Sequence, residues 1–365
     1  MVTMAEPTTT GSPMPDEPLL RAEDLRVHLD TPRGLLKAVD GVSFAIERGE
    51  TLGLVGESGS GKSMLVRSLM GICPSIAKIQ GSVRLDGREL VGVPRKEARK
   101  IWGNRIAMVF QDPMTSLNPV LRIDRQLTES MRLHLGLGKK EAGERAIELL
   151  TLVGIPEPLK RSRQYPHQLS GGMRQRVTIA MALACDPDVL IADEATTALD
   201  VTVQRQILDL LQEIQAERGM GMILVSHDLG VVAGRTDQIA VMYAGRMVEH
   251  SPTAELFAHR RHRYTEALLG AVPRLDVPRD QRPRAIPGSP PDLITLASGC
   301  AFAARCGAAD DLCRAQRPEL GEDLGTHRFA CHHPVGTDAP AGGGADAASG
   351  TGADEKPSLM KETPA

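Results

Sequence analysis

The chain has 365 residues, of which 41% are hydrophobic and only 2% aromatic, and its formal net charge is −3. This length is enough for two domains, and the scarcity of aromatic residues predicts an aliphatic core. The interspersed acidic and basic residues lack the strongly basic character of nucleic-acid-binding proteins, so no nucleic-acid partner is expected.

The start of the chain and its hydropathy predict a cytosolic protein. Residues 1–18 are rich in Pro, Thr and Ser, lack the basic and apolar regions of a signal peptide, and predict a disordered tail. No stretch approaches the roughly 18 apolar residues of a membrane span. In the cytosol, cysteines are expected to be reduced thiols or metal ligands rather than structural disulfides.

Strand and helix patterns alternate along the next part of the chain. Strands are predicted at LRVHLD and AVDGVSFAIERGE, followed by a buried strand at TLGLVG, a helix at KSMLVRSLMGI and another buried strand at RIAMVFQ. A helical pattern with 3.6-residue periodicity runs from about 120 to 165. We therefore predict an inserted helical subdomain over about residues 112–180.

The alternation continues to about residue 255. MRQRVTIAMALACDP predicts a helix that stops at Asp186 and Pro187, and DVLIADE predicts a buried strand. An amphipathic helix is predicted to end at Gly219, and MGMILVSHD and QIAVMYAGRMVE predict further strands. Such alternation is typical of an α/β protein with a largely parallel sheet and helices on both faces.

The C-terminal part differs in composition. Over residues 256–335 the sequence predicts a short helix, a Pro-rich linker and a compact module that contains cysteines. Residues 336–365 are of low complexity, rich in Gly, Ala and Asp, and predict a second disordered tail.

One glycine-rich stretch predicts a phosphate-binding loop. GESGSGKS fits G-x-x-x-x-G-K-[ST] between a predicted strand and a predicted helix, which is the context that this loop requires. Its glycines let the backbone wrap the β- and γ-phosphates, the lysine adds charge, and the last serine offers a hydroxyl to Mg²⁺. The predicted nucleotide-binding residues here are Gly56, Glu57, Ser58, Gly59, Ser60, Gly61, Lys62, Ser63 and Met64.

Polar residues follow three other predicted strands. Asp193 would hold Mg²⁺ through water and Glu194 would polarise the attacking water, although such an acidic pair could instead cap the next helix. His227 would hydrogen-bond the γ-phosphate, and Gln111 would touch both Mg²⁺ and the attacking water. Taken alone, His227 and Gln111 carry no functional meaning, and only their positions after strands argue for these roles.

In chain order, the phosphate loop, the strand before Gln111, the strand before Glu194 and the strand before His227 resemble the ATP-binding cassette (ABC) family over about residues 19–250. The stretch LSGGMRQR, which lies between the second and third of these motifs, belongs to the same resemblance. The resemblance implies the phosphate-loop cassette fold, with an antiparallel β subdomain, an inserted helical subdomain, and ATP and Mg²⁺ as cofactors. It also implies that Ser170, Gly171 and Gly172 close over ATP bound to a partner cassette, and that Asp200 links the two sites. From the residues alone, LSGG could also be a helix cap with a glycine turn.

Two positions depart from the family pattern. An aromatic ring usually stacks on adenine where this chain has Leu29, which predicts either a weaker adenine contact or a substitute contact from the adjacent His28. A proline usually follows the catalytic glutamate where this chain has Ala195, a change that removes no catalytic group.

The sequence further resembles ATP-binding subunits of oligopeptide, dipeptide and nickel importers. The stretches VFQDPMTSLNP, LSGGMRQRVTIAMAL and ADEATTALDVTVQ carry this resemblance, as does HRYTEALLGAVP, in which Arg263 replaces a proline. A cysteine module follows, comprising Cys300, Cys306, Cys313 and Cys331.

The spacing of the four cysteines matches no metal-binding pattern that geometry identifies, although four thiols in a reducing compartment suggest one metal site. The resemblance implies a [4Fe-4S] cluster; zinc, or metal-free packing or a disulfide, remains the alternative. His327, His332 and His333 lie nearby as competing ligands, and Cys73 and Cys185 are expected to be core residues.

The resemblance implies an ATPase at the cytoplasmic face of the cell membrane that energises peptide import. Its partners would be a second, paralogous cassette, two permease subunits and, through the complex, an extracytoplasmic peptide-binding protein. The alternatives are an importer of nickel or another small solute, a soluble ABC protein that acts on ribosomes or DNA, and a purely structural nucleotide-binding module. The single cassette without a long heptad run disfavours the second, and the presence of Glu194 and His227 disfavours the third.

Overall fold

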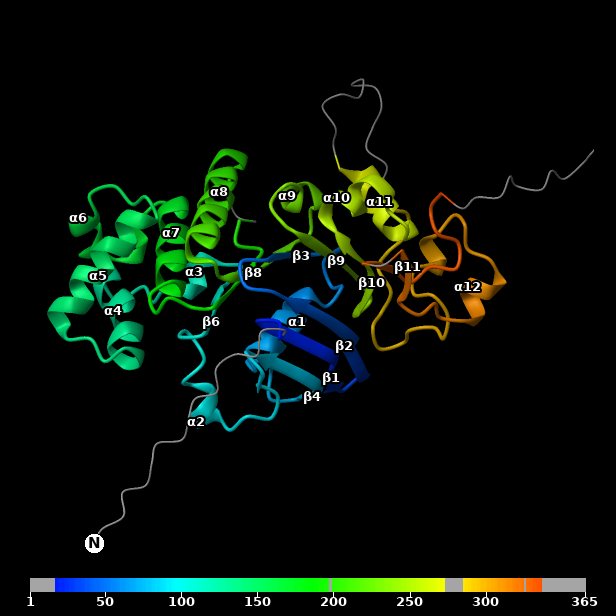
Figure 1. Ribbon diagram of the computed structural model, residues 1–365, viewed down its shortest axis with the longest axis horizontal. Helices are drawn as coiled ribbons and strands as arrows, with labels where there is room; N and C mark the ends of the chain where they lie inside the picture. The colour runs from blue at the N-terminus through cyan, green and yellow to red at the C-terminus, as the bar shows by residue number, and fades with distance from the viewer. Residues whose placement is uncertain (1–16, 197–198, 273–284, 325, 337–365) are drawn as a thin grey trace, which may run out of the picture.

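The computed structural model describes residues 17–196, 199–272, 285–324 and 326–336 (Figure 1). The predicted tails fall almost wholly outside these residues, as does much of the Pro-rich linker. Among the described residues, no helix combines the length and the hydropathy of a membrane span.

Two sheets form the centre of the structure. The first is a four-stranded antiparallel sheet with the order β2-β1-β4-β5. Its strands are β1 (Leu20–Thr31), β2 (Gly34–Ile46), β4 (Ala77–Leu85) and β5 (Arg88–Glu89). The second sheet has eight strands in the order β11-β12-β10-β9-β3-β8-β7-β6. These are β3 (Thr51–Val55), β6 (Ile106–Val109), β7 (Val189–Asp193), β8 (Gly221–Ser226), β9 (Gln238–Tyr243), β10 (Arg246–Pro252), β11 (Gly321–Leu324) and β12 (His327–Phe329).

The eight-stranded sheet is parallel from β9 through β3, β8 and β7 to β6, and antiparallel from β9 through β10 and β12 to β11. A parallel core with a separate antiparallel sheet confirms the predicted cassette fold. The helices are α1 (Lys62–Leu69), α2 (Arg95–Ala98), α3 (Pro113–Ser116), α4 (Ile123–His134), α5 (Lys139–Leu152), α6 (Pro158–Ser162), α7 (Gly171–Ala182), α8 (Val201–Arg218), α9 (Leu229–Val232), α10 (Thr253–His259), α11 (Arg263–Ala271) and α12 (Asp311–Ala315).

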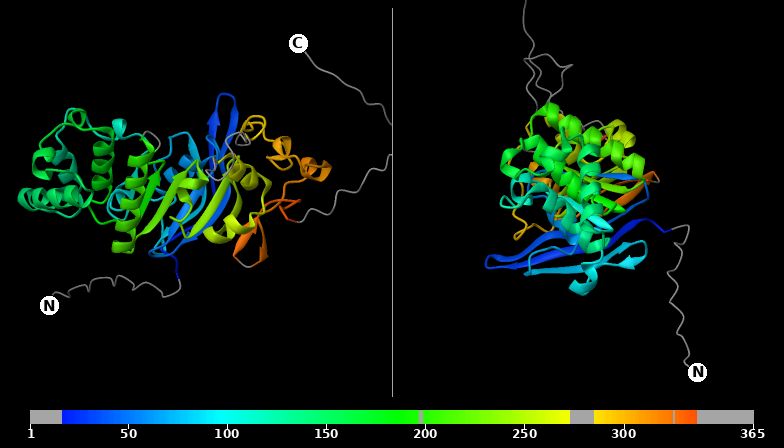
Figure 2. Two further views of the ribbon diagram at one scale, coloured as in Figure 1. Left: turned by 90° about the horizontal axis from the view of Figure 1, so that it is seen from above. Right: turned by 90° about the vertical axis from the view of Figure 1, so that its left-hand side faces the viewer.

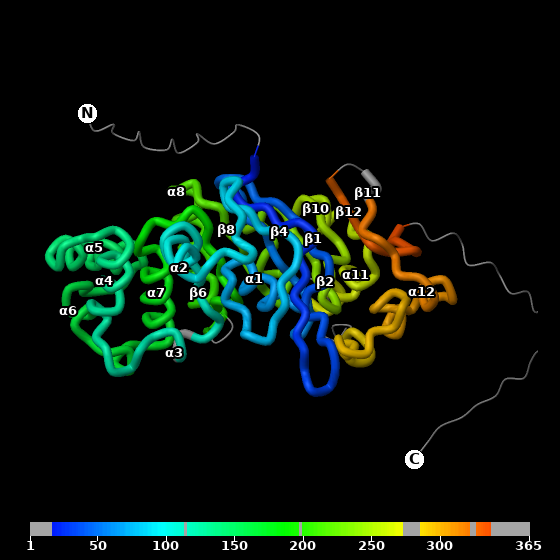
Figure 3. The backbone as a smooth tube through the Cα atoms, turned by 90° about the horizontal axis from the view of Figure 1, so that it is seen from below, coloured from blue at the N-terminus to red at the C-terminus, as the bar shows by residue number. Residues whose placement is uncertain are grey.

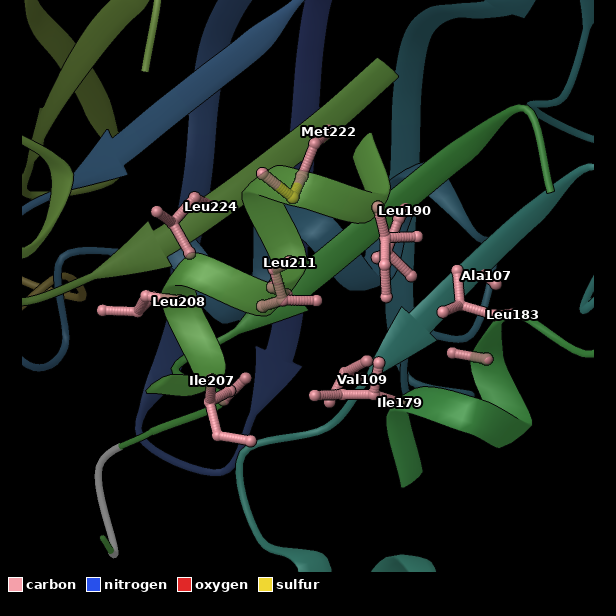
Figure 4. Packing of buried hydrophobic residues seen from close by; sticks show 14 of the residues in the cluster. Ala107, Val109, Ile179, Leu183, Leu190, Ile207, Leu208, Leu211, Met222 and Leu224 are labelled. Atoms are coloured by element: carbon pink, nitrogen blue, oxygen red, sulfur yellow. The ribbon is translucent and has the colours of Figure 1, made fainter. Parts of the chain in front are cut away.

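The parallel strands are buried on both faces, and successive residues enter different cores. In β7, Ile191 belongs to the core between the two sheets, where α1 contacts β1, β2 and β7. Its neighbour Leu190 belongs to the core on the other face, together with Leu211 of α8 and Ile179 of α7 (Figure 4). This alternation follows from the two-residue period of a strand, and it explains why β7 is apolar from Val189 to Ala192, before Asp193 ends it.

The molecule is elongated, with the cassette core in the middle (Figures 1 and 2). Helices α4, α5 and α6 lie at one end, and the segment that carries α12 lies at the other. The C-terminal segment joins the core directly, because β12 pairs with β10 and extends the large sheet. We call residues 256–336 the C-terminal extension.

Three details differ from the sequence predictions. The helix predicted to stop at Asp186 ends at Ala182, and Asp186 adopts a positive φ of 52° in the turn that follows. The stretch QIAVMYAGRMVE is a hairpin of two strands, because Ala244 and Gly245 both adopt positive φ. Strand β4 was not predicted, because most of its residues are exposed or half-buried.

Candidate active site

The glycine-rich loop lies between β3 and α1 and requires glycine at two close approaches. Gly56, Gly59 and Gly61 all have positive φ, at 157°, 81° and 104°. A Cβ atom on Gly56 would lie 2.2 Å from the carbonyl oxygen of Met242, and one on Gly61 would lie 2.2 Å from that of Ala38. The loop is therefore pressed against neighbouring backbone, and only glycine fits.

Lys62 is held inside the loop. Its side chain is 4% exposed, and its Nζ donates hydrogen bonds to the carbonyl oxygens of Gly56 (2.7 Å) and Glu57 (3.0 Å). Burial lowers the pKa of Lys62, and the nearby carboxylates, led by Glu194, oppose this shift. The loop thus presents a buried ammonium group beside its own backbone, as phosphate binding needs.

The end of β7 brings two carboxylates to this loop. Asp193 is buried, burial raises its pKa, and it accepts a hydrogen bond of 3.2 Å from Ser63 Oγ. Hydroxyl and carboxylate oxygens are the ligands that Mg²⁺ prefers, so this pair fits a magnesium site.

Glu194 lies where three further groups meet. Gln111 Nε2 donates a hydrogen bond of 2.8 Å to its Oε2, while Lys62 Nζ and His227 Nδ1 lie 3.9 and 3.7 Å from its Oε1. Its backbone has a positive φ of 46°, a conformation that non-glycine residues rarely adopt and that is found at functional sites. The carboxylate is thereby aimed at the phosphate loop.

The topology explains this convergence. The strand order β3-β8-β7-β6 makes neighbours of the strands that precede Lys62, His227, Glu194 and Gln111. Because these strands are parallel, all their carboxyl ends lie at one edge of the sheet, where ligands of open α/β sheets bind.

The LSGG segment lies at the N-terminus of α7. Ser170 caps α7 by accepting a hydrogen bond of 3.3 Å from the Met173 N–H, and Ser170 and Gly171 are exposed. A Cβ atom on Gly172 would lie 2.9 Å from Val203 of α8. Asp200 caps α8 and is also exposed. The segment therefore presents an open helix N-terminus at the surface.

Other predicted nucleotide contacts fare differently. Ser58 is exposed, Ser60 is buried with its Oγ unpartnered among the described residues, and Met64 packs between the two sheets. Leu29 is only 6% exposed and belongs to the core, so it offers no open face to an adenine ring. His28 is occupied by a hydrogen bond of 3.1 Å to Asp40.

The four cysteines of the C-terminal extension gather around one small pocket. Cys300, Cys306, Cys313 and Cys331 all line it, together with His332 and His333, whereas His327 instead pairs with the buried Glu249 at 2.8 Å. All six cysteines of the chain are free thiols. Burial raises the pKa of Cys300, Cys313 and Cys331. Donor atoms of Asp310, Cys313 and His333 lie within 4.8 Å of one another.

The two remaining cysteines follow helices rather than lie in them. Cys185 comes after α7 and is buried as expected, but Cys73 comes after α1 and is only half-buried. Cys73 is therefore not a full core residue, although burial still raises its pKa to about 11.

Two residues of the extension contact the phosphate loop and were not singled out from the sequence. The hydroxyl of Tyr264 accepts a hydrogen bond of 2.7 Å from the backbone N–H of Glu57, and Arg305 forms an ion pair with the Glu57 carboxylate. The only signal for Tyr264 was its place in the HRYTEALL stretch, and nothing local distinguished Arg305 from the chain's other arginines.

Comparisons with known families agree with this architecture. The profile of the ABC transporter family matches residues 39–197, and that of the oligopeptide/dipeptide transporter C-terminal region matches residues 248–313. Among solved structures, a dimeric post-hydrolysis state of the ATP-binding cassette MJ0796 bound to ADP and Pi has a TM-score of 0.58 and 27% identity. It covers 64% of this chain and 98% of that one.

Curated relatives match over most of the chain. The oligopeptide transport ATP-binding protein OppD of Salmonella typhimurium is 48% identical over 328 residues, which are 90% of this chain and 97% of that protein. OppD of Escherichia coli is 48% identical over 317 residues, 87% of this chain and 94% of that protein. OppD of Mycobacterium tuberculosis is 50% identical over 315 residues, and the match spans 52% of its length. With a cassette fold, the converged site of Glu194 and these matches, the chain belongs to the ABC transporter ATPases of the oligopeptide/dipeptide type.

Proposed function

We propose that the chain is the ATP-hydrolysing subunit that energises import of oligopeptides or dipeptides through an ABC transporter. The observation that carries this proposal is the placement of Glu194 among Lys62, Gln111 and His227, in a chain that also has the oligopeptide-type extension.

Each residue at the edge of the sheet has a role in hydrolysis. The loop from Gly56 to Ser63 and the Lys62 ammonium group bind the β- and γ-phosphates, and Ser63 with Gln111 and Asp193 would hold Mg²⁺, which neutralises charge on the phosphates. Glu194 accepts a proton from the attacking water and orients it, and His227 donates a hydrogen bond to the γ-phosphate. The attacking oxygen forms its bond to phosphorus as the bond to ADP breaks.

A second cassette would complete the site. Ser170, Gly171 and Gly172 would bind the γ-phosphate held by the partner's loop, and Asp200 would link the two sites. Support comes from the exposure of Ser170, Gly171 and Asp200 and from the open N-terminus of α7, which suits an anion. Closure of the pair on ATP and its release after hydrolysis would move the permeases between two states.

Two permease subunits would contact the helical end of the molecule, near Gln111 and the DPMTSLNP stretch. Phe110 and Val120, which flank this stretch, are 41% and 76% exposed, and a partner would cover these apolar side chains. The chain would then lie at the cytoplasmic face of the membrane, and an extracytoplasmic peptide-binding protein would deliver the solute.

The four cysteines that line one pocket would hold a [4Fe-4S] cluster, which supplies redox-active iron where it is bound. Four free thiols around a common space are the donor set for such a cluster, and the same set also suits zinc. Iron content and visible absorption of the purified chain separate the two metals.

Uptake by cells that lack only this chain tests the transport function. Labelled dipeptides, longer peptides and nickel are compared side by side, with the wild-type chain and Lys62→Ala reintroduced. We expect loss of peptide uptake that only the wild-type chain restores. Lost nickel uptake with intact peptide uptake would move the assignment to a metal importer, and no transport defect would overturn it.

A further inference from the structure

One buried arginine of the C-terminal extension contacts the phosphate loop. Arg305 ends the short 3₁₀ turn Ala303–Arg305, and its side chain is 4% exposed. Its two terminal nitrogens donate hydrogen bonds of 2.6 and 3.0 Å to the two carboxylate oxygens of Glu57, the second residue of the phosphate loop. This is a two-pronged arginine–carboxylate pair, which fixes direction as well as distance.

The rest of the guanidinium group is also fixed. Arg305 Nε donates a hydrogen bond of 2.7 Å to the Pro287 carbonyl oxygen, and its Nη1 lies 3.3 Å from the Tyr243 hydroxyl. The guanidinium carbon lies 5.9 Å from the ring centroids of both Tyr243 and Phe302. Arg305 is therefore held from several sides, and the position of Glu57 follows from it.

Tyr264 holds the same residue by its backbone. This side chain is fully buried in α11, and its hydroxyl accepts the Glu57 N–H. The rings of Tyr243, Tyr264 and Phe302 pack against one another with centroids 4.5 to 5.4 Å apart. Two of the chain's three tyrosines therefore lie beneath this loop, in a protein with few aromatic residues.

The contacts converge on the residues that hold phosphate. Glu57 is bonded by Arg305 at its side chain, by Tyr264 at its N–H and by Lys62 at its carbonyl oxygen. Because the Glu57 N–H and carboxylate are already engaged, they orient the loop rather than bind phosphate. A loop anchored at its start loses less freedom when ATP binds.

We propose that Arg305 and Tyr264 are positioning residues that hold the phosphate loop in its ATP-binding shape, so that nucleotide affinity depends on the C-terminal extension. The reacting groups Glu194, Gln111 and His227 lie on other segments and keep their own contacts. Loss of the contacts that Arg305 and Tyr264 make with Glu57 should therefore weaken ATP binding and leave the chemical step nearly unchanged. The proposal needs only ATP binding, so it stands or falls independently of the transported solute.

The test measures the affinity of the purified full-length chain for a fluorescent ATP analogue with Mg²⁺. In Arg305→Met we expect affinity to fall by about tenfold, as for a loop that spends about a tenth of its time in the competent shape. The affinity of Arg305→Lys should lie between those of the wild type and Arg305→Met, because lysine cannot form the two-pronged pair. Arg314→Met is the matched control, since Arg314 lies in the same extension but pairs locally with Asp311 at 3.0 Å.

A double variant distinguishes the loss of the Arg305–Glu57 contact from a general loss of stability. Glu57→Gln should weaken binding as Arg305→Met does, and the two together should weaken it no further. In ATPase assays of the assembled transporter, the KM of Arg305→Met for ATP should rise by about tenfold over the wild type, while kcat stays within about twofold.

Three outcomes would overturn the proposal. One is wild-type affinity in both Arg305→Met and Glu57→Gln, whatever their thermal stability. Another is an equal loss in Arg314→Met. The third is a double variant whose loss is the product of the two single losses. If Arg305→Met does not fold, Glu57→Gln and Arg305→Lys carry the same test, because both keep side chains of similar size.

Discussion

At the carboxyl edge of the central sheet, each functional group follows its own strand, and parallel pairing brings the groups together around Glu194. In the C-terminal extension, contacts are made by single residues far apart in the chain, such as Arg305 with Glu57 and His327 with Glu249. The first region is assembled by regular topology, and the second by side chains that fit a particular tertiary position. The extension therefore contacts the phosphate loop without contributing a sequence motif to it.

The largest effect is expected at the sheet edge, from Glu194→Gln. Loss of the carboxylate removes the base for the attacking water, and such groups contribute about 10²- to 10⁴-fold to rate. We expect turnover in the assembled transporter to fall by this factor while ATP binding is kept. Glu217→Gln, on the exposed side of α8, is the control and should leave turnover unchanged. Undiminished ATPase in Glu194→Gln would remove this residue from the mechanism.

In the extension, Cys306→Ser should abolish binding of the proposed metal. Cys306 is one of four thiols on a shared pocket, so its loss leaves the donor set incomplete. Iron and zinc content, with the visible absorption spectrum of anaerobically purified protein, give the readout. Cys73→Ser is the control because Cys73 lies in another part of the fold, beside the end of α1. Equal metal content in the wild type, Cys306→Ser and Cys73→Ser would show that the four cysteines hold no metal.

The joint between extension and sheet should be sensitive to acid. His262 caps α11, with its Nδ1 accepting the Tyr264 N–H at 3.0 Å, and burial lowers its pKa from 6.5 to about 4. The unfolded chain therefore binds more protons than the folded one between these values, and stability falls as pH drops through this window. His262 alone should lower the free energy of unfolding by about 2 kcal/mol between pH 7.5 and 5.

Unfolding by urea across this pH range measures the effect. His262→Asn keeps a capping side chain but has no titrating group, and its stability should depend less on pH. His250, in the same joint, also has a pKa lowered to about 4 by burial, so part of the dependence should persist in the variant. An unchanged pH profile in His262→Asn would contradict the assignment.

The smallest effect is expected where the β1–β2 hairpin meets the extension. Arg33 lies 2.5 Å from Asp292, and the hairpin runs toward the extension in Figure 3. The Arg33 side chain is 74% exposed, and such ion pairs contribute little. Arg33→Ala should leave Tm unchanged in a thermal melt, in contrast to the buried Arg305. A clear fall in Tm would show that the hairpin, too, supports the extension.

Local patterns in the amino-acid sequence are sufficient to specify part of this protein. A strand, a glycine-rich turn and a helix specify the phosphate loop, because only glycine allows its positive φ angles and close approaches. Apolar runs ending in Asp193, His227 or Gln111 specify buried parallel strands, and parallel pairing implies that their ends meet. Even the helix end at Gly219 follows from one residue with a left-handed backbone.

The remaining contacts depend on tertiary packing. No sequence pattern distinguishes Arg305 or Glu249 from other charged residues, because their roles come from burial among partners tens or hundreds of positions away. The same holds for Leu29, which has the register of an adenine contact but lies in the core, and for QIAVMYAGRMVE, which folds as two strands. A local pattern fixes backbone conformation and burial on average. Which side chains then meet depends on how separate segments pack.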